Sequence, residues 1–355
     1  MMNLELVEKI ADAVLYEGYM LYPYRASSIK NRQRFNWGAL APRSYSEAQR
    51  GTEAWEMQTQ CLAEGVENTR VTIKVRFLHL AMRRIGKFEP PLPEWRDDVE
   101  PAFTRAPSLE AGGKLYQEWQ EAVERDVVLP ELNLAHDGSG EFEFAFPCSR
   151  SLEPVPDPDG KIAGVLVRSR EAVRGVVEYR VEGVGTSNLF KLTVKIKNLT
   201  DLEDAGERSR EEALLSSIVS THTILSIKNG EFVSLLDPPA HLRDIAQTCQ
   251  NIGTYPVLAG AEGSHEFILS SPIILYDHPE IAPESAGDLF DGTEIDEILT
   301  LRIMTLTDEE KREMRGIDDR ARKILERTEM MPEEQLLKMH GALRGLSKHK
   351  GAANG

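Results

Sequence analysis

Apolar and polar residues alternate along several stretches of the chain, and this period of two is typical of half-buried β-strands. The clearest stretch follows Thr69, where Val71, Ile73, Val75 and Phe77 alternate with polar residues. Similar patterns predict strands over 141–146, 162–168, 175–182, 190–197, 254–260, 266–276 and 295–306. Consecutive strands at this spacing favour antiparallel pairing.

Two local signals refine this pattern. Asn229-Gly230 stands between two apolar runs and predicts a β-hairpin that joins 223–227 to 231–236. Along 190–197 the polar positions include three lysines, which predict a solvent-facing side and an edge strand protected by charge. These lysines are Lys191, Lys195 and Lys197.

A period of about 3.6 residues predicts helices elsewhere. Near the start, one apolar face comprises Val7, Ile10, Ala11, Val14 and Leu15. Helices are also predicted over 46–64, from Trp55, Thr59 and Leu62, and over 108–125, from Leu115, Trp119, Ala122 and Val123. Ser209-Arg-Glu-Glu212 and Thr307-Asp-Glu-Glu310 fit capping boxes, and Pro332 suits the first turn of a last helix.

Together these elements predict an α+β fold with an antiparallel β-sandwich-like core between N-terminal and C-terminal helices. We expect residues 1–68 to form helices and an aromatic, basic loop packed on the core. Residues 69–306 are expected to form the mainly antiparallel core with inserted helices, and residues 307–345 a helical segment. A disordered tail is expected over 346–355.

Charge and composition exclude several classes of protein. The 355 residues carry a net charge of -16, which disfavours nucleic acid as a ligand because the phosphate backbone is also negative. We find no apolar run long enough for a membrane span and no signal peptide, so a cytoplasmic location is expected. The widely spaced Cys61, Cys148 and Cys249 predict buried reduced thiols rather than a metal knuckle or a disulfide scaffold.

A group of imidazole and carboxylate side chains is the best candidate for metal chemistry. It comprises His265, Glu266, Asp277, His278 and Glu280. Their spacing matches no known ligand motif, and the structural alternative is favoured, in which His278 caps a strand end and hydrogen-bonds Asp277 or a nearby carbonyl. No cofactor is predicted on this interpretation, whereas the metal hypothesis needs a divalent ion.

Two further stretches carry candidate chemistry. Thr221-His222-Thr223, with Asp237 nearby, has the residue types of a general base and its orienting carboxylate, although a polar position on a strand is the favoured interpretation. Residues 19–38 interleave aromatic and basic side chains, and an anion or partner site there would use Arg25, Lys30, Arg32, Arg34 and Trp37. The favoured alternative is a loop whose aromatic rings pack under a sheet.

Several motifs resemble an uncharacterised protein family encoded beside the structural genes of nickel-iron hydrogenases in actinobacteria and other soil bacteria. The motifs are Leu275-Tyr-Asp-His-Pro-Glu-Ile-Ala-Pro-Glu-Ser285, the stretches 288–302 and 305–310, Tyr22-Pro-Tyr-Arg-Ala-Ser-Ser28 and Leu235-Leu-Asp-Pro-Pro239. The resemblance covers most of the chain and implies a role in hydrogenase assembly, maturation or support. It supplies no catalytic residues. The chain lacks the paired cysteine motifs of a hydrogenase catalytic subunit.

Three hypotheses about function follow. The first is a cytoplasmic accessory protein that binds hydrogenase subunits or maturation factors. The second is a metal-dependent hydrolase built on His265, Asp277, His278 and Glu280. The third is a structural subunit that forms homo-oligomers through apolar faces of the helices after residue 307.

Overall fold

The computed structural model describes residues 2–15, 37–136, 138–185 and 188–280. Beyond these it describes Lys311, Arg322, Leu325, Glu326, Glu329 and Met330. The strand predicted over 295–306 and the capping box at 307–310 lie outside the described residues, as does the tail.

Most of the described chain is β-strand. The helices are α1 (Met2–Leu15), α3 (Arg43–Ala48), α4 (Arg210–Leu214) and α5 (Arg243–Ala246). The first strands are β1 (Glu56–Leu92), β2 (Thr104–Ala106), β3 (Ser108–Ala111), β4 (Lys114–Gln117), β5 (Trp119–Val128), β6 (Leu132–Asn133) and β7 (Ser139–Phe146). The rest are β8 (Ser149–Pro156), β9 (Ile162–Arg170), β10 (Val173–Gly183), β11 (Leu189–Asn198), β12 (Val219–Val233), β13 (Tyr255–Ala259) and β14 (Phe267–Ser271).

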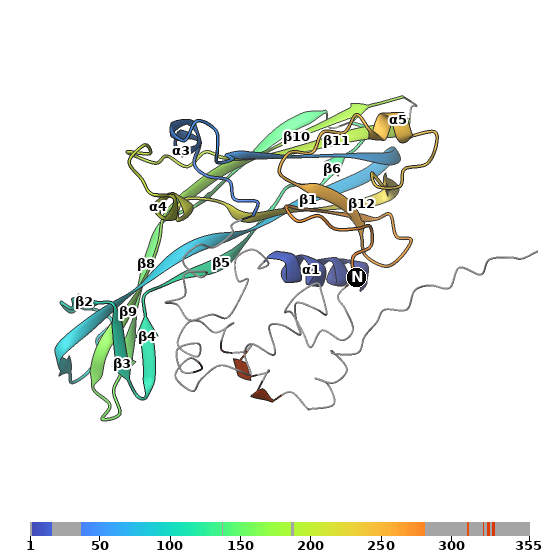
Figure 1. Cartoon of the computed structure of the whole chain (residues 1–355). Helices are drawn as coiled ribbons and strands as arrows, with labels where there is room; N and C mark the ends of the chain where they lie inside the picture. Colours follow the sequence, from blue (N-terminus) through green and yellow to red (C-terminus); the bar gives the residue numbers. More distant parts are fainter. Residues whose placement is uncertain are drawn as a thin grey trace, which may run out of the picture.

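The strand β1 is 37 residues long and runs the length of the molecule (Figure 1). Its first part pairs with β11 on one edge and β12 on the other, in the order β13-β14-β12-β1-β11-β10-β7. Its later part pairs with β5 and β9. All these pairs are antiparallel, so one strand connects the two halves of the sheet.

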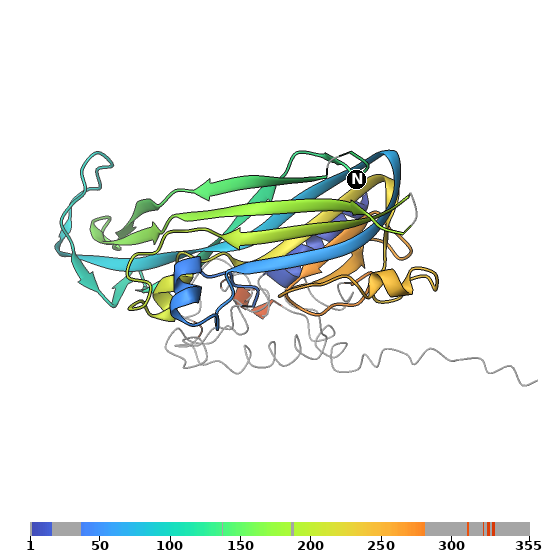
Figure 2. The same cartoon turned by 90° about the horizontal axis from the view of Figure 1, so that it is seen from above.

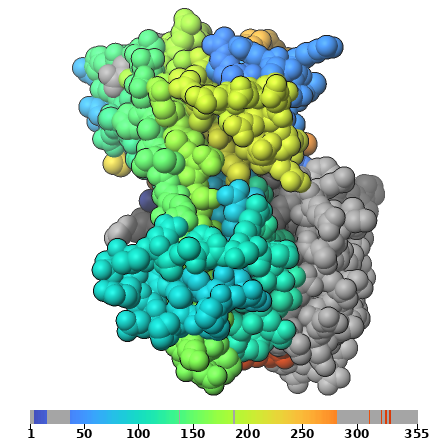
Figure 3. All heavy atoms as spheres, turned by 90° about the vertical axis from the view of Figure 1, so that its left-hand side faces the viewer, coloured from blue at the N-terminus to red at the C-terminus, as the bar shows by residue number. Residues whose placement is uncertain are grey.

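The two halves are visible as two lobes. Figure 3 shows the cyan and green lobe at the far end of β1 below the lobe that carries α3 and α4. The far lobe has its own apolar cluster, which includes Ile85, Leu109 and Leu166. The larger core lies between the layers of the first half and includes Ile73, Val75, Phe77, Leu192 and Val194, all at most 1% exposed.

The helix α1 packs against the opposite face of β12 and β14. Its residues Val7, Ile10, Ala11 and Val14 form one buried cluster with Ile224, Val257, Ala259, Phe267 and Leu269. Burying each valine, isoleucine, leucine or phenylalanine side chain of this cluster contributes about 1.5–3 kcal/mol. The helix predicted from this apolar face is therefore confirmed, and the face is what positions α1 on the sheet.

The predicted α+β fold with an antiparallel sandwich-like core is confirmed. The strands predicted over 69–80, 141–146, 162–168, 175–182 and 190–197 are present as parts of β1, β7, β9, β10 and β11. The strand β1 runs through residues 68 and 69, where the first two segments of the chain were expected to meet. The capping box at Ser209 and Glu212 is also present, although its helix ends at Leu214.

Two predicted helices are wrong. Residues 56–64 belong to β1, because Met57, Thr59, Cys61 and Ala63 enter the core with period two and β11 supplies a partner along the whole stretch. Residues 108–125 form β3, β4 and most of β5 instead. Gly112-Gly113 joins β3 to β4 with both φ angles positive, as a type I′ hairpin turn requires.

The predicted Asn-Gly hairpin is also wrong. The first expected arm and residues 231–233 of the second belong to the single strand β12, and β1 pairs with both parts. Asn229 has a φ of 56° because it lies opposite an irregularity of β1 between Gly65 and Arg70. The lysines of β11 do face the polar side of the sheet, but β11 lies between β1 and β10 and is no edge strand.

Candidate functional site

The predicted basic and aromatic site falls mainly outside the described residues. Arg25, Lys30, Arg32 and Arg34 all lie there. Trp37 lies within the described residues, shortly before Leu40, which forms an isolated β-bridge with Ile218. Trp37 itself is 42% exposed. This site therefore stays a prediction.

Asp277, one of the predicted metal ligands, ties the segment after β14 to the sheet. Its Oδ1 accepts a hydrogen bond from the Leu258 amide at 2.8 Å, and its Oδ2 accepts one from the Ser234 hydroxyl. The next residue, His278, donates its backbone N–H to the Leu258 carbonyl at 2.8 Å. We call these contacts among Ser234, Leu258, Asp277 and His278 the Asp277 junction.

The other predicted ligands do not join Asp277 in a metal-binding group. His265 uses its Nδ1 to contact the Phe232 carbonyl at 2.8 Å, and Glu280 is exposed. His278 has a φ of 54°, and its buried Nδ1 has no hydrogen-bond partner among the described residues. Across the part of the chain that the structure describes, no three His, Cys, Asp or Glu side chains are arranged to hold a metal ion.

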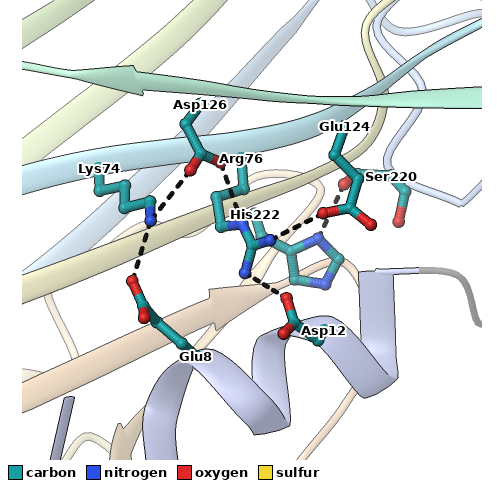
Figure 4. A network of polar contacts seen from close by, with 8 residues as sticks. All are labelled: Glu8, Asp12, Lys74, Arg76, Glu124, Asp126, Ser220 and His222. Carbon is teal, nitrogen blue, oxygen red and sulfur yellow. Dashed lines mark hydrogen bonds and ion pairs between the residues drawn. The ribbon is translucent and has the colours of Figure 1, made fainter. Parts of the chain in front are cut away.

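A cluster of charged side chains between α1 and the sheet was not predicted (Figure 4). We call it the Arg76 cluster, and it comprises Glu8, Asp12, Lys74, Arg76, Glu124 and Asp126. The guanidinium of Arg76, only 8% exposed, lies 2.6 Å from Asp12, 3.2 Å from Glu124 and 3.1 Å from Asp126. Lys74 bridges Glu8 and Asp126 at 3.0 Å each.

Opposite charges raise the pKa of both cations of this cluster, Lys74 and Arg76. Burial alone would lower the pKa of Arg76, but the hydrogen bond to Asp12 and the charges of Asp12, Asp126 and Glu124 outweigh burial and raise it. Because α1 supplies Asp12, β1 supplies Arg76 and β5 supplies Glu124, the cluster joins three elements that are distant in sequence. Each charge has a partner, so the arrangement is suited to positioning α1.

His222, the predicted general base, lies beside this cluster and is fully buried. A carbonyl can only accept a hydrogen bond, so its Nδ1 donates to the Ser220 carbonyl at 2.8 Å. Its Nε2 then accepts from the Ser271 hydroxyl at 3.1 Å. Burial, together with the nearby charge of Arg76, lowers the pKa of His222 to about 4. Both ring nitrogens are therefore occupied in a neutral histidine without access to solvent.

The signals for the Arg76 cluster were present in the sequence but ambiguous. Glu8 and Asp12 stand four residues apart on the polar side of α1, where solvent exposure is the usual outcome. Glu124 and Asp126 alternate with period two, but they lie in a stretch whose apolar spacing also fits a helix. Only the pairing of β5 with β1 brings these carboxylates to Arg76.

A groove with a volume of about 530 Å³ lies on the polar face of β7, β10, β11 and β1. Its lining includes Glu141, Glu178, Arg180, Glu182 and Lys195. Three of these already form ion pairs, Arg180 with Glu182 at 2.9 Å and Glu178 with Lys197 at 2.6 Å. The groove is open and mixed in charge.

Exposed apolar side chains flank the Asp277 junction. Ile274 is 72% exposed and Tyr276 is 85% exposed, whereas Leu275 between them is 5% exposed. Leu236, 56% exposed, donates its backbone N–H to the Ser234 hydroxyl of the same junction. Large apolar side chains this exposed on an anchored segment are typical of surfaces that contact other proteins.

No protein-family model matches the chain. A search of curated proteins gives no match either. Among the described residues, no helix has the length and hydrophobicity needed to cross a membrane.

Proposed function

We propose that this chain is a non-catalytic accessory protein that acts by binding a protein partner. The observation that carries the proposal is the exposure of Ile274 and Tyr276 on a segment anchored by Asp277. An exposed aromatic side chain on a fixed backbone loses little conformational entropy when it binds, so such residues are often the strongest contacts of an interface.

The predicted reactive groups have structural roles that favour binding over catalysis. Asp277 uses both carboxylate oxygens in hydrogen bonds that hold backbone in place. His222 is neutral, buried and hydrogen-bonded at both ring nitrogens. A general base needs a route to its substrate and a pKa near the working pH, and His222 has neither.

The class of partner comes from the family resemblance. The exposed Tyr276 and the anchoring Asp277 both belong to the Leu275-Tyr-Asp-His-Pro279 motif on which that resemblance rests. We therefore propose subunits or maturation factors of a nickel-iron hydrogenase as partners, with the complex located in the cytoplasm. The net charge of -16 favours a protein over nucleic acid.

Affinity purification from a hydrogenase-producing host tests this proposal. The tagged chain should retain identified hydrogenase subunits or maturation factors, and a double Ile274→Ser, Tyr276→Ser variant should retain at least tenfold less. The matched control is Val99→Ser, an apolar residue with 54% exposure in the segment between β1 and β2. Substitutions of exposed residues usually change stability by about 0.5 kcal/mol or less, so both variants should fold.

Two results would count against the proposal. One is a wild-type eluate without any hydrogenase component. The other is equal recovery of the same component by the double variant and by Val99→Ser, since the segment around Asp277 would then not be the contact.

A further inference from the structure

The strand β7 has an open edge. It pairs with β10 on one side, and within the described ranges no strand pairs with its other side. In Figure 2 the green β7 is the outermost strand beyond β10 and β11. An open edge of this length presents unpaired backbone groups and can accept another strand.

The register of β7 identifies the backbone groups that point outward. The Val181 amide donates to the Gly138 carbonyl, so Gly138 and every second residue after it form the hydrogen-bonded pairs with β10. The intervening residues direct their N–H and C=O groups away from β10. These residues are Ser139, Glu141, Glu143 and Ala145.

The outer edge of β13, at the other end of the sheet, is blocked by contrast. Pro256 has no N–H to offer. Two residues later, Leu258 has both backbone groups occupied, its N–H by the Asp277 carboxylate and its C=O by the His278 amide. The sheet is therefore protected at β13 and open at β7.

The side chains of β7 define what could bind there. On one face Phe142, Phe144 and Phe146 are half-buried and pack against the main core. On the other face Glu141 and Glu143 are exposed. An added strand would therefore place apolar side chains beside the phenylalanines and cationic side chains beside the glutamates.

The charge around Glu141 favours a cationic ligand. Glu141 lies directly opposite Glu178 across the strand pair, and like charges in that position are destabilising. Glu178 has Lys197 as its partner at 2.6 Å, whereas neither Glu141 nor Glu143 forms an ion pair with any residue that the structure describes. The 530 Å³ groove beside Glu141 offers room for a long cationic side chain.

We propose that β7 is a docking edge for an extended segment of a partner protein in which basic and apolar residues alternate. The segment would add to the sheet as a strand through the outward backbone groups of Glu141, Glu143 and Ala145. A second copy of this chain is disfavoured as the occupant, because two β7 edges would bring their glutamates together. This inference goes beyond the proposed function, since β7 does not include the segment around Asp277.

A fluorescently labelled nine-residue peptide that alternates Lys and Val is the probe, and anisotropy measures its affinity for the full chain. We expect binding that weakens with salt, and at least tenfold weaker binding of a matched peptide that alternates Glu and Val. The double variant Glu141→Gln, Glu143→Gln should reduce this preference several-fold.

Proline at position 145 separates strand addition from simple charge attraction. The Ala145 amide points away from β10, so Ala145→Pro removes a donor from the open edge and leaves the ladder with β10 intact. We expect Ala145→Pro to weaken the Lys-Val peptide at least tenfold and Ala145→Ser, which keeps the N–H, to leave its affinity unchanged. Equal melting temperatures would establish that both variants are folded.

The inference is overturned if Ala145→Pro binds the Lys-Val peptide as well as Ala145→Ser does, or if the Glu-Val peptide binds equally. It is also overturned if sedimentation shows a wild-type dimer that Ala145→Pro dissociates, because the occupant would then be a second copy. None of these three results depends on whether a hydrogenase component is recovered with Ile274 and Tyr276, so the two proposals can fail separately.

Discussion

At the scale of single residues, the buried histidine makes stability depend on pH. Histidine in an unfolded chain has a pKa near 6.5, whereas burial lowers the pKa of His222 to about 4. Above pH 6.5 both states are neutral and the stability is complete. Between pH 6.5 and 4 the unfolded state binds a proton that the folded state does not, so stability is lost as the pH falls.

We therefore predict that wild-type protein loses about 2 kcal/mol more than a His222→Asn variant when the pH changes from 7 to 5. Urea unfolding at the two pH values measures the difference. Burial also lowers the pKa of His79 to about 4. Because His79 is present in both proteins, its contribution to the pH dependence cancels from the comparison. The same pH dependence in wild type and variant would show that His222 is accessible to protons when folded.

Arg76 is the residue with the most ion-pair partners in the Arg76 cluster. Replacing it with glutamine removes the cation that pairs with Asp12 and Glu124 and leaves Asp126 with Lys74 alone, so we predict a loss of about 2 kcal/mol or more in unfolding free energy. Arg174→Gln is the control, because Arg174 is 57% exposed and its ion pair with Asp201 spans 3.5 Å. Equal small losses in urea unfolding would contradict a structural role for Arg76.

At the scale of elements, short segments limit what the sequence predicts. Residues 55–64 match two patterns. The spacing of Trp55, Thr59 and Leu62 fits one face of a helix, and the spacing of Met57, Thr59 and Cys61 fits one face of a strand. Local propensity cannot separate these patterns, and the pairing with β11 decides between them. The Gly112-Gly113 pair indicates a hairpin turn, but the helical spacing of the apolar residues around it favoured a helix. The strands around Val71 and Phe190 showed alternation alone and were predicted correctly.

Where β1 meets β9, two backbones approach closely. A Cβ on Gly164 would collide with the carbonyl oxygen of Gly86 and the side chain of Leu109. We predict that Gly164→Ala lowers the unfolding free energy by about 1–3 kcal/mol. In Gly183→Ala the new methyl group has no atom within 4 Å, so thermal unfolding should change little. An unaltered melting temperature for Gly164→Ala would contradict the close approach.

At the scale of the whole molecule, the sequence predicts the fold class but not the connections. Alternation identifies which residues of β1 face the core, but nothing local shows that one strand continues for 37 residues and joins two lobes. The same limit applies to the candidate sites. His222 and Asp277 were identified from residue type, but their structural roles depend on Ser271, Ser234 and Leu258, which are distant in sequence.

The central claim is that this molecule works through surfaces and not through a reactive group. Its most direct test is restoration of hydrogenase activity in a strain that lacks the gene, with protein amounts matched by immunoblot. We predict that His222→Asn and Val99→Ser restore wild-type activity and that the Ile274→Ser, Tyr276→Ser variant does not. The claim would be contradicted if the Ile274→Ser, Tyr276→Ser variant restored full hydrogenase activity and the His222→Asn variant, present in the same amount, restored no activity.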